Sequence, residues 1–179
     1  MKKVLLQVFF IVLAVFNLVY AVCFPWFLRY LLLRITGSKV GKFSCIQRVK
    51  FFGFGKLKVG RNVIINSGCY LDNRRGIEIG DYVVIAHNTK IYTLGHDFND
   101  ETFVTKGRPV VIEDYAIVFS NVLIMPGVTI KRGAVILPGA VVTKDVEAMA
   151  VMGGNPATKI RTREILHTKK EVFRYWFST

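Results

Sequence analysis

Acidic residues are scarce in this chain, with 12 aspartates and glutamates against 25 lysines and arginines, and the net charge is +13. A basic balance of this size suits nucleic acid, anionic lipid or a phosphorylated ligand as a partner. The sequence has no helix-turn-helix, zinc-finger or aromatic RNA-binding motif, so we do not expect nucleic acid. The positive charge therefore favours lipid or a phosphorylated small molecule.

Cysteine is also rare, and Cys23, Cys45 and Cys69 form no CxxC pair. An odd number without that spacing argues against a disulfide framework or a structural zinc site. We expect buried or lipid-facing thiols in a reducing compartment and no bound metal.

Charge is absent from the segment between Val4 and Leu28. An apolar run of this length can cross a bilayer with some tilt. A cleavable signal peptide is the alternative, because two lysines precede the run and residues 19–21 resemble a cleavage site. The run is longer than the apolar region of a signal peptide, so we favour a retained membrane segment. It can span the membrane or return as a hairpin.

Pro25 is expected to end or kink the first helix, and a second short helix follows it. The next part of the chain is basic, with lysine or arginine at Lys39, Lys42, Arg48 and Lys50. The positive-inside rule then places the rest of the chain in the cytoplasm. We assign residues 1–36 to a hydrophobic, membrane-associated helical segment.

The rest of the chain repeats with a period of six. Aliphatic residues recur at this spacing at Val59, Ile65 and Leu71, at Ile79, Ile85 and Ile91, and at Ile112, Val118, Ile124, Ile130, Ile136 and Val142. A second ladder of small or aliphatic residues runs through Ala116, Val122, Val128, Ala134 and Ala140. A period of six matches neither a helix nor a simple strand. It predicts an all-β solenoid, a parallel β-helix over residues 37–160, with four triangular coils. A sandwich of short strands is the alternative, but its turn signals recur less often.

A loop interrupts this ladder at residues 93–109, after a smaller slip at 73–76. A regular solenoid has no structural need for such a loop, so we expect it to build a site. His96 lies near its start, in the sequence Gly95-His96-Asp97.

The C-terminal segment 161–179 alternates apolar and basic residues and is predicted to be an amphipathic helix. It would cap the solenoid or rest on a membrane.

The chain resembles the hexapeptide-repeat acyltransferases, and within them the galactoside, maltose and exopolysaccharide O-acetyltransferases. The resemblance covers about residues 57–160. It rests on the ladder, on Gly95-His96-Asp97, and on the segments MPGVTI (125–130), GAVVTKDV (139–146) and GNPATKI (154–160). It implies a left-handed coil, a homotrimer with sites between subunits, and transfer of an acetyl group from acetyl-CoA to a sugar hydroxyl.

The resemblance also implies roles for single residues. His96 matches the catalytic histidine, a general base for the hydroxyl. Ser120 matches the residue whose backbone N–H stabilises the oxyanion formed from the thioester. Asn66, Asp72 and Asp97 match positions that bind the acceptor.

Positions that contact the cofactor in this family correspond to Ser120, Pro138, Thr143 and Lys144. Lys144 suits a phosphate group, whereas Pro138 has no N–H to donate. Bulky residues replace the usual corner glycines at Glu113, Phe119, Lys131 and Leu137. The groove for the pantetheine arm is therefore expected to differ in shape.

A membrane segment on such an enzyme suggests a lipid-linked saccharide as acceptor, in capsule, O-antigen or exopolysaccharide synthesis. The location would be the cytoplasmic face of a bacterial inner membrane. The γ-class carbonic anhydrases share the coil, but His87, His96 and His167 lack the spacing of their zinc ligands. A catalytically inactive, membrane-bound scaffold remains the alternative function.

Overall fold

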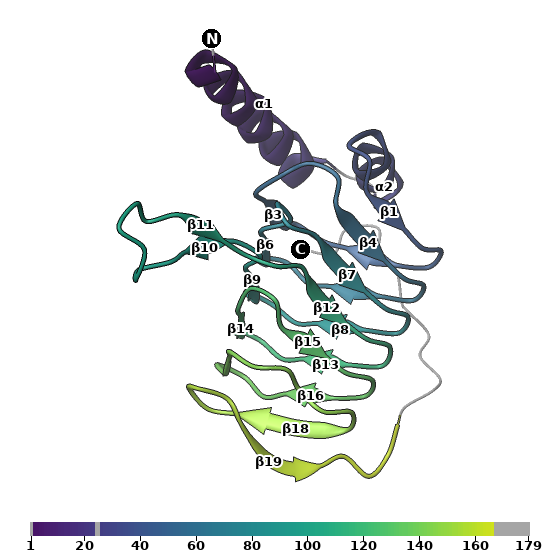
Figure 1. The fold of residues 1–179 in the computed structure, drawn as a ribbon. Helices are drawn as coiled ribbons and strands as arrows, with labels where there is room; N and C mark the ends of the chain where they lie inside the picture. The colour runs from purple at the N-terminus through teal and green to yellow at the C-terminus, as the bar shows by residue number, and fades with distance from the viewer. Residues whose placement is uncertain (1, 24–25, 167–179) are drawn as a thin grey trace.

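The computed structural model describes residues 2–23 and 26–166 of the chain: two helices followed by a triangular solenoid (Figure 1). Helix α1 spans Lys2–Val22 and α2 spans Trp26–Ile35. The solenoid has about six turns, and each complete turn contributes one short strand to each of three faces.

The three faces are parallel β-sheets, here named A, B and C. Sheet A contains β1 (Lys39–Val40), β4 (Leu57–Val59), β7 (Ile77–Ile79), β12 (Val110–Ile112) and β15 (Thr129–Ile130). Sheet B contains β2 (Cys45–Ile46), β5 (Ile64–Ile65), β8 (Val84–Ile85), β13 (Ile117–Val118), β16 (Val135–Ile136), β18 (Ala150–Gly153) and β19 (Thr158–Thr162). Sheet C contains β3 (Lys50–Phe51), β6 (Tyr70–Leu71), β9 (Lys90–Ile91), β14 (Leu123–Ile124) and β17 (Val141–Val142).

Two strand pairs depart from the parallel pattern. Strands β10 (Gly95–His96) and β11 (Thr105–Lys106) form an antiparallel hairpin outside the three faces. Strand β19 runs antiparallel to β18 at the end of the solenoid.

Both sequence ladders point into the solenoid, as their period predicts. Ile85, Ile112 and Ile124 have no exposed surface, and neither do Ala116 and Val122 of the small ladder. Each repeat buries one aliphatic and one smaller side chain, which keeps the coil narrow. Burial of the larger side chains contributes roughly 1.5–3 kcal/mol each and dominates the stability of the fold.

The predicted four coils are too few, because the solenoid extends beyond the ladder at both ends. The first coil contains β1, β2 and β3, and its step from Ile46 to Phe51 is five residues instead of six. At the other end, Val146 follows Val142 by only four residues and pairs with Ile130. These irregular steps hide the terminal coils from a search for period six.

The predicted C-terminal helix does not begin at residue 161. Arg161 and Thr162 belong to β19, and residues 163–166 have no regular secondary structure. The remainder of the predicted helix, 167–179, including His167, lies outside the described residues. The cap that a solenoid end needs is supplied here by the antiparallel strand β19.

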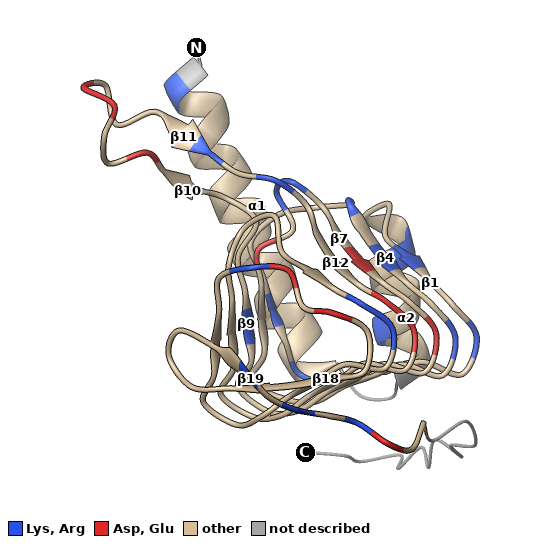
Figure 2. Ribbon diagram, turned by 60° about the horizontal axis from the view of Figure 1, so that its bottom comes forward, with Lys and Arg blue, Asp and Glu red and all other residues tan. Residues whose placement is uncertain are grey.

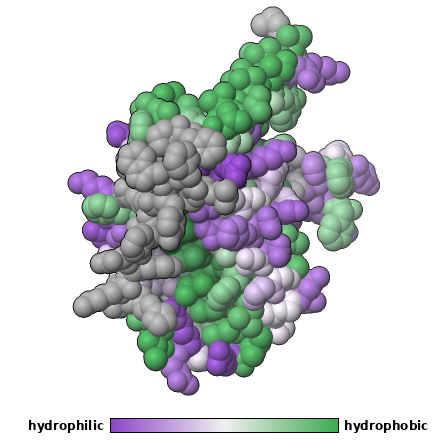
Figure 3. Space-filling model, turned by 180° about the vertical axis from the view of Figure 1, so that it is seen from behind, coloured by the Kyte–Doolittle hydropathy of each residue, from purple (hydrophilic) through white to green (hydrophobic). Residues whose placement is uncertain are grey.

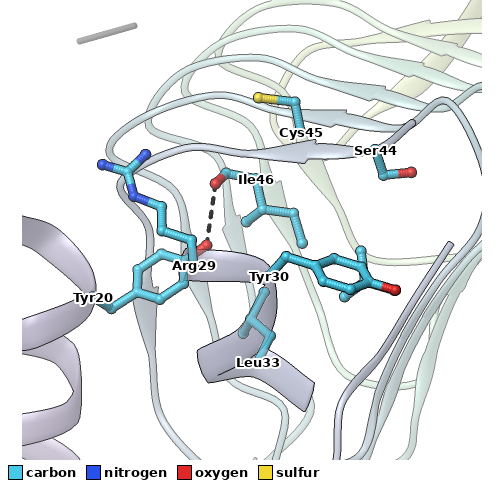
Figure 4. Close-up of a pocket in the computed structure, with 8 residues that line it drawn as sticks. Tyr20, Arg29, Tyr30, Leu33, Ser44, Cys45 and Ile46 are labelled. Carbon is cyan, nitrogen blue, oxygen red and sulfur yellow. Dashed lines mark hydrogen bonds between the residues drawn. The ribbon is translucent and has the colours of Figure 1, made fainter. Parts of the chain in front are cut away.

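The two helices close the other end of the solenoid (Figure 1). Tyr20 is fully buried there and its hydroxyl donates a hydrogen bond to the carbonyl of Ile46 (3.1 Å; Figure 4). Leu33 of α2 is also buried in the same core. By length and composition α1 is apolar enough to cross a membrane, and most of its surface is exposed. Both helices therefore contribute buried side chains to the core of the solenoid.

Candidate active site

The predicted site residues lie at two edges of sheet C. Ser120, Pro138 and Asn66 follow strands of sheet B, so they lie at the corner between sheets B and C, the B–C corner. Asp72 follows β6, and Thr143 and Lys144 follow β17, so these residues lie at the corner between sheets C and A, the C–A corner. The β10–β11 hairpin leaves the solenoid from the C–A corner.

The hairpin presents His96 to solvent. His96 pairs with Thr105 across the two strands, and the hairpin projects away from the solenoid (Figures 1 and 2). The imidazole of His96 stacks flat on the ring of Phe103, with 4.4 Å between ring centroids and 4° between planes. The histidine is therefore exposed while its ring plane is held, which suits a base that must meet a substrate in one orientation.

Asp97 stabilises the hairpin itself. Its Oδ2 lies 3.0 Å from the ammonium of Lys106, and its Oδ1 accepts a hydrogen bond from the N–H of Asn99. The bond from Lys106 is the main cause that holds the pKa of Asp97 below its ordinary value. Asp97 is thus ionised at neutral pH and engaged within the hairpin.

Asp72 anchors the base of the hairpin. Its carboxylate has no exposed surface and accepts two hydrogen bonds from the guanidinium of Arg74, at 2.8 and 2.9 Å. Thr93 donates its hydroxyl proton to the backbone carbonyl of Asp72 (2.7 Å) and accepts the N–H of Arg75. The carboxylate of Asp72 is therefore enclosed by its own chain. It orients Arg74, whose side chain is partly exposed and covers the ring of Phe52.

We expect Asp72→Asn to loosen this anchor. An amide cannot accept both guanidinium bonds, but Arg74 can partly rehydrate, so the free energy of unfolding should fall by about 1–3 kcal/mol. Thermal unfolding will measure the loss, and limited proteolysis should show faster cleavage within 97–105. Glu78→Gln, which removes an exposed pair with Lys58, is the matched control and should be nearly neutral. Wild-type unfolding and cleavage in Asp72→Asn would contradict the anchoring role.

The N–H of Ser120 is available at the B–C corner. The amides on either side are used, since Phe119 donates to Ile136 and Asn121 donates to His87. Within residues 2–23 and 26–166, the N–H of Ser120 has no hydrogen-bond partner. Phe119, one of the predicted bulky corner residues, is 41% exposed beside it. An unpaired donor next to an apolar side chain suits the binding of a developing oxyanion.

One chain does not bring His96 and Ser120 together, because they lie at opposite edges of sheet C. Two hollows of the described chain, one between α2 and the first coil (Figure 4) and one along sheet A, contain neither residue. A site that forms between two chains would not be a pocket in either of them. Within the described part of the chain, no cluster of three or more His, Cys, Asp or Glu side chains is placed to hold a metal.

Sequence patterns did not reveal three residues that shape this site: Arg74, Thr93 and Phe103. Arg74 lies two residues after Asp72 at the slip in the ladder, and this slip was the only signal for it. Thr93 ends the last regular step before the loop. Phe103 could not be found, because its contact with His96 depends on the register of a hairpin without a strong turn motif.

The comparisons with known proteins agree with this geometry. No protein-family model matches the sequence. The chain is 34% identical over 143 residues to the putative colanic acid biosynthesis acetyltransferase WcaF of Escherichia coli K12, covering 79% of this chain and 78% of that protein. It is 31% identical over 137 residues to the galactoside O-acetyltransferase of the same organism, covering 74% and 68%.

A solved structure matches as well. The hexapeptide-repeat acetyltransferase of Vibrio cholerae O1 biovar eltor, in complex with acetyl coenzyme A, superposes with a TM-score of 0.78 at 31% identity. The match covers 86% of both chains.

The chain belongs to the hexapeptide-repeat acetyltransferases. The resemblance read from its motifs is thereby confirmed, as are the left-handed β-helix and the class of enzyme.

Proposed function

We propose that this acetyltransferase moves an acetyl group from acetyl-CoA to a hydroxyl of a lipid-linked saccharide, with His96 as the general base. The observation that carries the proposal is that the chain has both an exposed, oriented imidazole at His96 and an unpaired backbone N–H at Ser120. The acetyl coenzyme A bound by the Vibrio relative supports the donor. The names of the colanic acid and galactoside relatives support a saccharide as the class of acceptor.

The residues suit acyl transfer in two steps. His96 takes the proton of the sugar hydroxyl, and the oxygen forms a bond to the thioester carbon. The carbonyl oxygen becomes an oxyanion, which accepts a hydrogen bond from the N–H of Ser120. The C–S bond then breaks and the acetyl ester remains on the sugar. The thiolate of coenzyme A leaves and accepts from His96 the proton that came from the sugar hydroxyl.

The site requires two subunits. Sheet B presents half-buried aliphatic residues outward at Ile64, Val84, Ile117 and Val135. Apolar side chains gather on this face in Figure 3, and packing it against another chain would bury them. We propose a homotrimer in which the hairpin of one chain carries His96 to the Ser120 corner of the next.

Several corner residues are proposed to bind the substrates. Asn66, half-buried at the B–C corner, would hold the acceptor, while Asp72 and Asp97 act by positioning Arg74 and the hairpin. For acetyl-CoA, Thr143 and Lys144 are exposed at the C–A corner, and the ammonium of Lys144 suits a phosphate. Pro138 is exposed near Ser120 and contributes shape without an N–H.

The membrane helix favours an acceptor that is itself in the membrane. Exposed apolar residues cover α1, and net positive charge favours the cytoplasmic face of a bacterial inner membrane. Residues 1–36 would hold the enzyme where a lipid-linked saccharide is assembled. A lipid-linked acceptor raises the local concentration of substrate without any additional contact with the sugar.

The proposal is tested by mass spectrometry of glycolipids extracted from membranes of cells with and without the gene. We expect glycolipids heavier by one acetyl group only when the gene is present. Purified full-length protein should transfer labelled acetyl from acetyl-CoA to the unmodified extract. An inactive scaffold would give neither result, and unchanged glycolipids together with no transfer would overturn the proposal.

A further inference from the structure

Helix α1 is attached along one side to the first coil. The residues on this side recur at helical spacing and pack on the segment 51–54 or in the core: Phe9, Phe10, Leu13, Phe16 and Tyr20. The remaining faces of the helix are apolar and exposed, for example Leu5, Ile11 and Leu18.

Two hydrogen bonds fix the C-terminal half of the helix. The side chain of Asn17 accepts the N–H of Phe51 (2.8 Å) and donates to the carbonyl of the same residue (2.9 Å). Asn17 therefore satisfies the open edge of β3, and α1 cannot leave the solenoid for the bilayer core without losing both bonds. These two bonds fix the position of α1 along β3 of the first coil.

These contacts leave too little helix to cross a bilayer. The hydrocarbon core is about 30 Å thick and needs about 20 helical residues. Only residues 2–8 extend beyond the first aromatic contact at Phe9, which is about 10 Å of helix. For α1 to span, the segment 51–54 would have to enter the membrane with its exposed neighbours Lys50 and Lys56. Placing those two cations at the centre of the bilayer costs about 3 kcal/mol each.

The helices and the first coil carry charge of one sign. No aspartate or glutamate precedes Asp72 in the sequence. Exposed cations near the helices include Arg34, Lys39, Lys42, Lys50 and Lys56. Exposed apolar residues of α2 lie among them: Phe27, Leu28, Leu31 and Ile35. An apolar surface surrounded by these cations fits an anionic lipid surface.

We propose that α1 does not cross the bilayer: α1, α2 and the first coil dock together into one leaflet of an anionic membrane. The proposal rests on the membrane association argued under the proposed function and chooses between the span and the hairpin that the sequence left open. A chain that never crosses stays on the side where it is made, so the solenoid and the N-terminus both face the cytoplasm.

The docking also sets the position of the hairpin. Phe10 of α1 contacts Phe52, and Phe52 lies under the guanidinium of Arg74, which Asp72 holds at the base of the hairpin. The helix and the hairpin leave the solenoid on the same side (Figures 1 and 2). His96 is therefore held in a fixed relation to the membrane surface, where the sugar of a lipid-linked acceptor would lie.

The test is the sidedness of the N-terminus in the full-length protein. An epitope placed before Met1 should be digested by protease in inside-out membrane vesicles and protected in intact spheroplasts. The protein should remain on the membrane through a high-salt wash, because apolar burial is not screened. Binding to phosphatidylcholine vesicles should become stronger when phosphatidylglycerol is included. An epitope digested in spheroplasts would show a span and overturn the inference, while leaving the proposed chemistry intact.

Two variants test the reason for the docking. Asn17→Leu makes α1 more apolar and removes both bonds to Phe51, so part of the epitope should become accessible in spheroplasts. Val15→Leu changes an exposed position and should behave as wild type. If Asn17→Leu matches this control, Asn17 does not hold the helix in place.

Loss of the protein in the salt wash, or a soluble assembly in which copies cover each other's α1, would overturn membrane docking altogether. Failure of acetyl transfer with unchanged sidedness would affect only the proposed function.

Discussion

The His96→Ala variant will turn over at least about 100-fold more slowly than wild type, because the sugar hydroxyl loses its general base. His96 is exposed and its ring stacks on Phe103 of the same hairpin, so the substitution removes no buried surface from the solenoid. We therefore expect the same oligomer by size-exclusion chromatography and the same unfolding midpoint. Acetyl transfer at saturating acetyl-CoA measures the effect, since the loss should fall on kcat.

His87→Ala is the comparison variant for this experiment. His87 is also exposed, and its carbonyl accepts the N–H of Asn121 next to Ser120 at the B–C corner, so it is the other imidazole near the proposed site. We expect this variant to retain most of the activity. If His96→Ala remains near the wild-type rate, or if both variants fall equally, the hairpin does not carry the catalytic base.

Mixed trimers of His96→Ala and Ser120→Trp chains will recover activity that neither variant has alone. Ser120→Trp places a bulky ring over the N–H that we assign to the oxyanion. If each site takes His96 from one chain and Ser120 from the next, every mixed trimer contains one intact site. Random mixing of equal amounts should then give about a quarter of the wild-type rate.

Co-expression with two different affinity tags allows trimers that contain both chains to be purified. Each variant expressed alone with both tags is the control and should be inactive. Restored transfer only in the mixed preparation requires His96 and Ser120 to come from different chains. If mixed trimers form and remain inactive, the two residues serve the same subunit's site or one assignment is wrong.

The interior of the solenoid was predictable because its period is a direct result of its geometry. Each flat step must return an aliphatic side chain to the axis, so Ile112 and Ile124 are identified by spacing alone. The first coil was missed because the step to Phe51 is short, and because its core is completed by Tyr20 from α1. A helix that fills the end of a solenoid leaves no periodic signal.

The positions of the site residues in the fold could be predicted from the sequence, but the contacts between their side chains could not. His96 could be placed on a loop, and Ser120 at a corner, from the ladder and the family motifs. The pairing of Asp72 with Arg74 could not, because an aspartate at a corner can face solvent, substrate or a neighbour equally well. Which of these occurs depends on packing between coils whose residues lie some twenty positions apart, such as Asp72 and Thr93.

The antiparallel strand β19 has a consequence for how these molecules can aggregate. A parallel solenoid with open ends exposes unpaired strand edges to which another copy can add, and repeated addition produces a fibre. Here β19 covers the edge of β18 with a strand of opposite direction, and Asn17 satisfies the edge of β3 at the other end. One strand edge is thus covered at each end, which disfavours growth along the axis and favours lateral contacts between chains.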